Sequence, residues 1–219
     1  MSKDKKQILL VEGESDRAFF EQVCKALGLK TVTVAPPRDL AGTHNTKQGV
    51  FNHLPVLLAQ LADGGIARLA VVVDADTVAN GGGFTNALQR VSDIVALYDF
   101  AQAVHPHGGI VFRNKDGLKD FGLWVMPNNL GEGMLEDWVK QCIVPAESVL
   151  FTRAETSVAA LPLPLKFKGH HRCKAEVATW LAWQKRPGHG MYQAVEDGLL
   201  DTNSAHFQRF VAWMKHVYI

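Results

Sequence analysis

Carboxylate residues gather at two points in the N-terminal half of the chain, and each point directly follows an apolar run. EGESD (residues 12–16) follows ILLV, and DAD (residues 74–76) follows AVVV. Carboxylates that are held close together repel one another, which either raises a pKa or calls for a cation. Mg²⁺ prefers oxygen ligands of this kind. We therefore expect Glu12, Asp74 and Asp76 to form a divalent-cation site.

The spacing of the second acidic pair predicts how its side chains point. Asp74 and Asp76 are two residues apart, so on an extended backbone both carboxylates point to the same side. Glu12 would add a third charge. A divalent ion in such a site keeps positions open for phosphate oxygens, and it can activate water and stabilise the charge of phosphoryl transfer.

The elements that must position these acids alternate between strand and helix patterns. The continuous apolar run at 67–77 is typical of a parallel strand covered on both faces. Alternating strands and helices predict an α/β fold with a mostly parallel sheet flanked by helices. Sites in such sheets lie at the carboxyl ends of strands, so Glu12 and Asp74 converge if their strands are neighbours. The other predicted strands are 6–13, 31–37, 108–113 and 121–127, and the predicted helices are 19–27, 51–61, 88–100 and 134–143.

The last third of the chain has a different pattern. After the proline-marked stretch LPLPLKF, helical spacing occurs at 174–184, 191–197 and 207–217. We expect an α/β domain over residues 1–145 and a helical extension over 146–219 packed on it. A single domain is the alternative.

The two acidic motifs together resemble a known family. EGxxD after a first strand (Glu12, Gly13, Asp16), followed by DxD after a later strand (Asp74, Asp76), resembles the Toprim domain. That domain occurs in DnaG-type primases, topoisomerases, recombination proteins and OLD-family nucleases. The resemblance covers roughly the first 140 residues, and it is strongest to stand-alone Toprim-like proteins of unknown function and to OLD-family nucleases. It implies a Rossmann-type sheet, Mg²⁺ or Mn²⁺ as cofactor, and phosphoryl transfer on nucleic acid.

Two further acids are candidate ligands through this resemblance. OLD-like Toprim domains carry a Glu-containing acidic segment where this chain has LGEGMLED, so Glu136 would complete the metal site. Asp16 would both cap a helix and bind metal. The structural alternatives are a plain helix cap at Ser15 or Asp16, and an acidic first helical turn favoured by the helix dipole at Glu136 and Asp137. Glu14 is expected outside the site.

A basic segment, KFKGHHRCK, could bind a phosphate backbone even though the net charge of the whole chain is only +1. The candidate nucleic-acid contacts are Lys166, Lys168, Arg172 and Lys174. OLD-like nucleases have a functional lysine after their acidic segments, and by that resemblance Lys174 would stabilise charge on the transferring phosphate. The alternative is a solvated basic loop that enters a helix. The neighbouring His170, His171 and Cys173 do not have the ligand spacing of a zinc site.

These observations favour a metal-dependent nuclease, with Glu12 and Lys174 as catalytic residues, acting on DNA or RNA. A non-catalytic Toprim-like subunit that needs a partner, such as an ATPase, is the first alternative, and a homodimer is compatible with either. VVVDADT also resembles the first motif of HAD phosphatases, which would make Asp74 a nucleophile. However, that motif lies in the third predicted strand, and no later Gly–Asp–Asp segment follows. Toprim nucleases often act in phage defence, and the resemblance connects this chain with that role by association alone.

The cysteines and apolar runs predict the compartment. Three separated cysteines without a CxxC pair favour reduced thiols. The apolar run near the N-terminus is too short for a signal peptide, and no run reaches the roughly 20 residues of a membrane span. We expect a cytoplasmic protein without membrane association.

Overall fold

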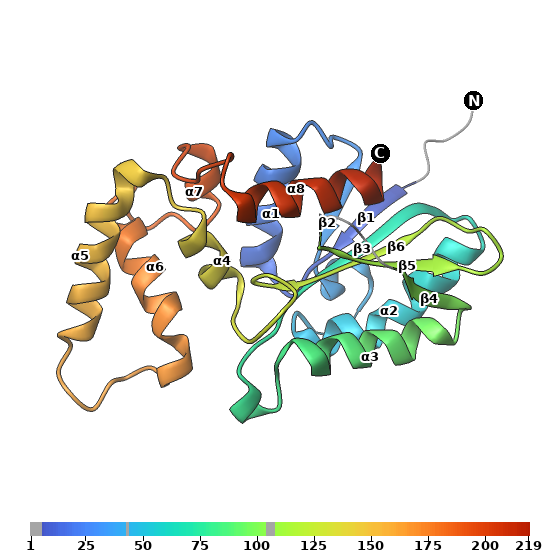
Figure 1. The fold of residues 1–219 in the computed structure, drawn as a ribbon, viewed down its shortest axis with the longest axis horizontal. Helices are drawn as coiled ribbons and strands as arrows, with labels where there is room; N and C mark the ends of the chain where they lie inside the picture. Colours follow the sequence, from blue (N-terminus) through green and yellow to red (C-terminus); the bar gives the residue numbers. More distant parts are fainter. Residues whose placement is uncertain (1–5, 43, 104–107) are drawn as a thin grey trace.

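A six-stranded sheet forms the centre of the molecule in the computed structural model, which describes residues 6–42, 44–103 and 108–219 (Figure 1). The strand order is β2-β1-β3-β6-β5-β4, in which the first four strands are parallel, β5 pairs antiparallel with β6, and β4 pairs antiparallel with β5. The predicted α/β class with a mostly parallel sheet is therefore confirmed. The strands are β1 (Lys6–Leu10), β2 (Val32–Ala35), β3 (Ile66–Asp74), β4 (Phe100–Ala103), β5 (Ile110–Asn114) and β6 (Phe121–Met126).

Helices cover both faces of the sheet. Alternate residues of β3 enter two hydrophobic clusters: Val72 packs with α1 and α8, whereas Val71 and Val73 pack with α2 and α3. This two-sided burial explains why the strand is apolar without interruption. The helices are α1 (Glu14–Ala26), α2 (Lys47–Ala62), α3 (Phe84–Ala96), α4 (Leu135–Gln141), α5 (Ser148–Ala159), α6 (Arg172–Ala182), α7 (Gln193–Glu196) and α8 (Ala205–Tyr218).

The two strands that precede the acidic motifs are neighbours. β1 and β3 run parallel, and Leu10 lies opposite Val71 in their register. Glu12 and Asp74 therefore leave the sheet at the same edge. The prediction that Glu12 and Asp74 converge required their strands to be neighbours, and this condition is confirmed.

Two elements differ from the predicted pattern. The helix expected over 88–100 ends at Ala96, because Phe100 begins the edge strand β4 and pairs with Asn114 of β5. Helix α5 was not predicted, since only Phe151, Ala154 and Val158 form its buried face and Ser and Thr are frequent in it. His105 and His107, expected at the surface in a turn, lie outside the described residues.

The C-terminal helices share a core with the sheet. Rings of α8 pack against Trp124 of β6, with centroid separations of 5.1 Å for Phe210 and 5.5 Å for Trp213. The Tyr218 hydroxyl donates a 2.7 Å hydrogen bond to the carbonyl of Ile8 in β1. The boundary expected near residue 145 thus divides one continuous hydrophobic cluster. No helix among the described residues is long and apolar enough to cross a membrane.

Candidate functional site

Four carboxylates and one lysine meet at the carboxyl ends of the parallel strands. Glu12 follows β1, Asp16 lies in the first turn of α1, Asp74 ends β3, and Glu136 lies in the first turn of α4. Each of the other three carboxylates acts electrostatically on Asp74, which places all four in one group. We call Glu12, Asp16, Asp74 and Glu136 the acid cluster. The structure therefore brings together residues that are as many as 124 positions apart in the sequence.

Backbone amides orient three of these carboxylates. The Asp74 N–H donates to Glu12 Oε1 at 2.8 Å, and the Leu135 N–H donates to Asp74 Oδ1 at 2.8 Å. The Gly13 N–H donates to Asp16 Oδ2 at 3.0 Å, so Asp16 caps α1 as predicted. Each of these bonds uses one carboxylate oxygen, and the second oxygen is the one that could bind a cation.

Crowding and burial favour the protonated forms of these acids. Burial raises the pKa of Glu12 to about 7, and the charges of Asp16 and Asp76 add to this rise, against the Asp74 amide and Lys47. Burial is also the largest cause that raises the pKa of Asp74 well above its ordinary value, followed by the charge of Glu12. Burial likewise raises the pKa values of Asp16 and Glu136. A cation in the acid cluster would relieve the same repulsion.

Lys174 of α6 faces the acid cluster. Its Nζ atom lies 3.9 Å from Glu136 Oε1, and its charge lowers the pKa values of Asp16, Asp74 and Glu136. Burial alone would lower the pKa of Lys174, but the four carboxylates outweigh it and raise that pKa. The lysine therefore stays charged and offsets part of the negative charge.

Three acids of the cluster line one small cavity. Glu12, Asp16 and Asp74 line a space of about 10 Å³ together with five apolar side chains, those of Phe20, Val72, Val73, Met126 and Leu135. Such a space holds roughly one water-sized particle. Among the described residues, no three His, Cys, Asp or Glu side chains stand in a geometry that could hold a metal ion as they are placed. The three residues fit a divalent cation by their donor chemistry, since all are carboxylates around one space.

Asp76 does not follow the expected geometry. The backbone leaves the extended conformation at this residue, with φ = 62°, and Asp76 forms an isolated bridge with Gly133. The Asp76 N–H donates to the Gly133 carbonyl at 2.8 Å. Its carboxylate instead pairs with Lys47 at 3.0 Å. The expectation that Asp74 and Asp76 project side by side from an extended strand is therefore wrong.

The remaining acids have structural partners. Asp137 lies in the acidic first turn of α4, as its structural alternative predicted, and it also caps the helix, since the Met134 N–H donates to Asp137 Oδ2 at 2.8 Å. Glu132 accepts a 2.6 Å hydrogen bond from the Val78 N–H and fixes the loop after β3. Glu14 is exposed and pairs with Arg17 at 2.6 Å, away from the cluster as expected.

The basic segment is divided between the site and other partners. Lys166 and Lys168 are exposed in the stretch before α6. Arg172 pairs with the buried Glu176 at 2.9 Å instead of facing the acid cluster. Lys174 is the member of this segment that joins the candidate site.

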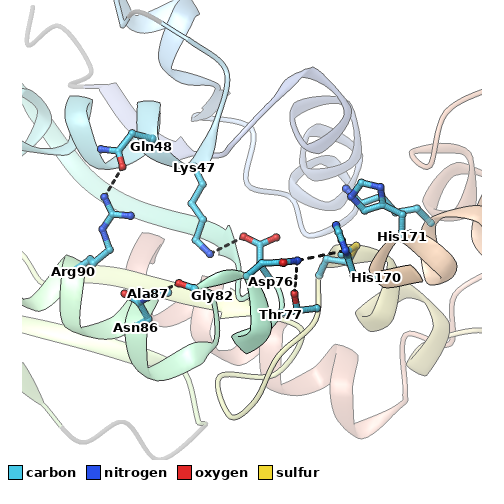
Figure 2. Close-up of a pocket in the computed structure, with 14 residues that line it drawn as sticks. Lys47, Gln48, Asp76, Thr77, Gly82, Asn86, Ala87, Arg90, His170 and His171 are labelled. Carbon is cyan, nitrogen blue, oxygen red and sulfur yellow. Dashed lines mark hydrogen bonds and ion pairs between the residues drawn. The ribbon is translucent and has the colours of Figure 1, made fainter. Parts of the chain in front are cut away.

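Two cations near the site had not been predicted. Lys47, at the start of α2, donates to the Ala75 carbonyl at 3.1 Å and to Asp76 Oδ2 at 3.0 Å (Figure 2). Arg90 of α3, at the left of Figure 2, lines the same pocket as Lys47. Nothing in the local sequence marks either residue, because only the packing of α2 and α3 beneath the sheet brings them to this edge.

Comparisons with known proteins place the chain in a family without assigning it an activity. No curated protein and no solved structure matches it. A family model described as "Protein of unknown function (DUF3226)" matches residues 6–219, which is nearly the whole chain. The chain therefore belongs to the DUF3226 family.

Proposed function

We propose that this protein is a Toprim-like, metal-dependent phosphoryl-transfer enzyme that acts as a nuclease on DNA or RNA. The observation that carries the proposal is the convergence of Glu12, Asp16 and Asp74 around one small cavity, with Glu136 and Lys174 beside them. A purely structural role rarely requires so many like charges at one point, because each must be desolvated against the others.

Mg²⁺ or Mn²⁺ would be held by Glu12, Asp74, Asp16 and Glu136. Asp76 is the fifth candidate ligand, and its ion pair with Lys47 would have to open first. A divalent ion bound here would supply Lewis-acid stabilisation of phosphate charge and a lowered pKa for bound water.

Two side chains would assist the chemistry directly. Glu12 would act either as a metal ligand or as a general base, because only the oxygen that does not accept the Asp74 amide is open to a cation or a proton. Its pKa of about 7 in the metal-free protein suits the role of general base. Lys174 would stabilise charge on the transferring phosphate.

Lys166 and Lys168, which are exposed, would contact the nucleic-acid backbone. We expect a smaller part for Arg172, whose guanidinium is already paired with Glu176.

A second candidate is a non-catalytic Toprim-like subunit that works with a partner, such as an ATPase. The observation that favours it is that Glu12, Asp16 and Asp74 each accept a backbone N–H, a bond that also stabilises the fold without any metal. The HAD-like phosphatase is disfavoured, because Asp74 ends the third strand along the chain and no later Gly–Asp–Asp segment follows.

The test is a cleavage assay on labelled single- and double-stranded DNA and RNA with Mg²⁺ or Mn²⁺, together with metal-induced shifts in melting temperature. Asp74→Asn should reduce cleavage by about 100-fold or more and weaken the metal shift. Asp63→Asn is the matched control, since Asp63 is exposed just before the start of β3, at the other end of that strand. Cleavage by Asp74→Asn at the parent rate would disprove the nuclease. Metal stabilisation without cleavage would support the partner-dependent subunit.

A further inference from the structure

A second and larger cavity, of about 370 Å³, lies beside the acid cluster. It forms where the start of α2, the loop after β3, the start of α3 and the turn before α6 meet (Figure 2). Lys174 lines this cavity and also pairs with Glu136 of the acid cluster, so one side chain links the cavity to the cluster. We call this cavity the basic hollow; its lining includes Lys47, Gln48, Asn80, Arg90, His170 and His171.

Arg90 is the most distinctive group in the basic hollow. Its Nη2 atom donates to Gln48 Oε1 at 2.5 Å, and its guanidinium lies 4.3 Å from the centre of the Phe51 ring. Both partners are uncharged, so they orient the guanidinium without neutralising it. A planar, pre-oriented guanidinium with spare N–H donors is well suited to bind phosphate oxygens.

Further positive charge surrounds the same space. Lys47 and Lys174 line it, and Asp76, the one carboxylate among its described lining residues, is already paired with Lys47. His170 and His171 lie across the hollow from Arg90 in Figure 2. The pKa of His171 is lowered by loss of hydration and then by His170 and Lys174, as expected in positive surroundings. The hollow therefore attracts an anion.

The other lining groups suit a phosphate more than a nucleobase. Gln48, Thr77, Asn80 and Asn86 line it with amide and hydroxyl groups, and none of the described lining residues is Phe, Tyr or Trp. The three amide nitrogens already donate to Asn52 Oδ1, Thr77 Oγ1 and the Gly81 carbonyl, so a phosphate would use N–H groups that these bonds leave. Hydrogen-bond donors with positive charge bind phosphates independently of sequence, whereas base binding uses aromatic stacking.

We propose that the basic hollow binds a second phosphate group of the substrate, next to the phosphate that reacts at the acid cluster. This inference rests on the proposed function, and it identifies the substrate as one with at least two phosphates in sequence, as in a nucleic-acid strand. Lys174 lies between the two positions and would contact both phosphates. The second phosphate comes either from the strand backbone or from a phosphorylated strand end.

The experiment measures fluorescence anisotropy of single-stranded oligonucleotides with a 5′-phosphate or a 5′-hydroxyl, in EDTA so that cleavage cannot occur. Arg90→Gln should raise the Kd about tenfold, the size of a charge-assisted hydrogen bond, and should reduce the salt slope by about one. Arg90→Lys, which keeps the charge and loses the planar fork, should lose less affinity. Arg90 is exposed on α3, so these variants should fold, which their melting temperatures will confirm.

Arg113→Gln is the matched control. Arg113 is exposed on β5, beside Phe112, which pairs with Phe121 at the start of β6. Asp74 pairs with Met126 at the other end of β6, so Arg113 and Asp74 lie at opposite ends of the strands. A loss in Arg90→Gln confined to the 5′-phosphorylated probe assigns the hollow to a strand end, and an equal loss for both probes assigns it to the backbone.

The proposal is overturned if Arg90→Gln binds like Arg113→Gln, or if the parent binds neither probe. Its failure is separable from that of the nuclease. Affinity that depends on Arg90 without any cleavage keeps the hollow and removes the nuclease. Cleavage that depends on Asp74, with a KM unaffected by Arg90→Gln, keeps the nuclease and removes the hollow.

Discussion

Glu12 is the residue at which burial, hydrogen bonding and neighbouring charge compete most closely. Burial favours its neutral form, whereas the Asp74 amide and Lys47 favour the carboxylate. The outcome is a pKa of about 7, within reach of both protonation states near neutral pH. A bound cation would shift this balance to the carboxylate, because metal binding and proton release are coupled.

The stability of the metal-free protein should therefore depend on Glu12 and pH. The folded state binds the Glu12 proton more tightly than the unfolded chain does, with a pKa of about 7 against 4.5. The stabilisation is complete below pH 4.5 and is lost as the pH rises to about 7, at about 1.4 kcal/mol per pKa unit. Glu12→Gln keeps an acceptor for the Asp74 amide but cannot ionise. In EDTA, its melting temperature minus that of the parent should thus increase from pH 5 to pH 7.5.

Two comparisons make this measurement decisive. Glu21→Gln, on the exposed face of α1, controls for the loss of a carboxylate from the same part of the chain. Mg²⁺ should stabilise the parent as the pH rises and reverse the trend. A difference that stays constant or shrinks with pH would show that Glu12 does not carry a raised pKa.

At the scale of elements, the loop after β3 separates the two parts of the site. The chain turns at Asp76, passes through the 3-10 turn η2 (Val78–Asn80), and returns so that the Gly83 N–H donates to the Ala75 carbonyl at 2.7 Å. Asp74 remains with the acid cluster, and Asp76 is carried to the basic hollow. This compact turn leaves no room for a side chain at Gly82.

Gly82→Ala should disrupt both the turn and the site. A Cβ atom at this position would lie 2.6 Å from the Ala75 carbonyl oxygen and 2.8 Å from the Asp76 Cβ atom. Relief requires backbone movement, and we expect a loss of about 1–3 kcal/mol in the free energy of unfolding, measured by urea denaturation. Gly131→Ala is the control, because a Cβ atom there meets nothing within 4 Å. Equal stabilities for the two variants would contradict the proposed constraint.

At the scale of the whole molecule, α8 closes the core over one face of the sheet. The Trp213 indole N–H donates to the Ile110 carbonyl at 3.1 Å, and its ring lies over Gly109 and Gly122, where a Cβ atom would collide with it or stand too close. The last helix is thus a structural part of the α/β unit. The sheet therefore depends on this last helix to complete the core on one of its faces.

Trp213→Ala should test that dependence. Trp213 is 0% exposed, so its removal leaves a cavity and an unpaired carbonyl, and should cost about 3–5 kcal/mol in the free energy of unfolding. Trp183, which is 43% exposed, provides the matched control, and Trp183→Ala should cost far less. Chemical denaturation of both variants measures the difference. Similar losses would mean that α8 contributes little to the core.

Local patterns in the sequence are enough to predict the α/β class and the acids at the strand ends, because apolar runs and helical periodicity reflect burial within each element. They also indicate Glu12, Asp74 and Lys174, whose positions follow from the ends of strands and helices and from a family resemblance. The folded chain is needed to see that Asp76 turns away to Lys47 and that Arg90 faces a second cavity. Edge strand β4 and helix α5 also become evident only in the folded chain. Backbone torsions in turns, and contacts between distant elements, depend on the order of strands in the sheet, which no local pattern specifies.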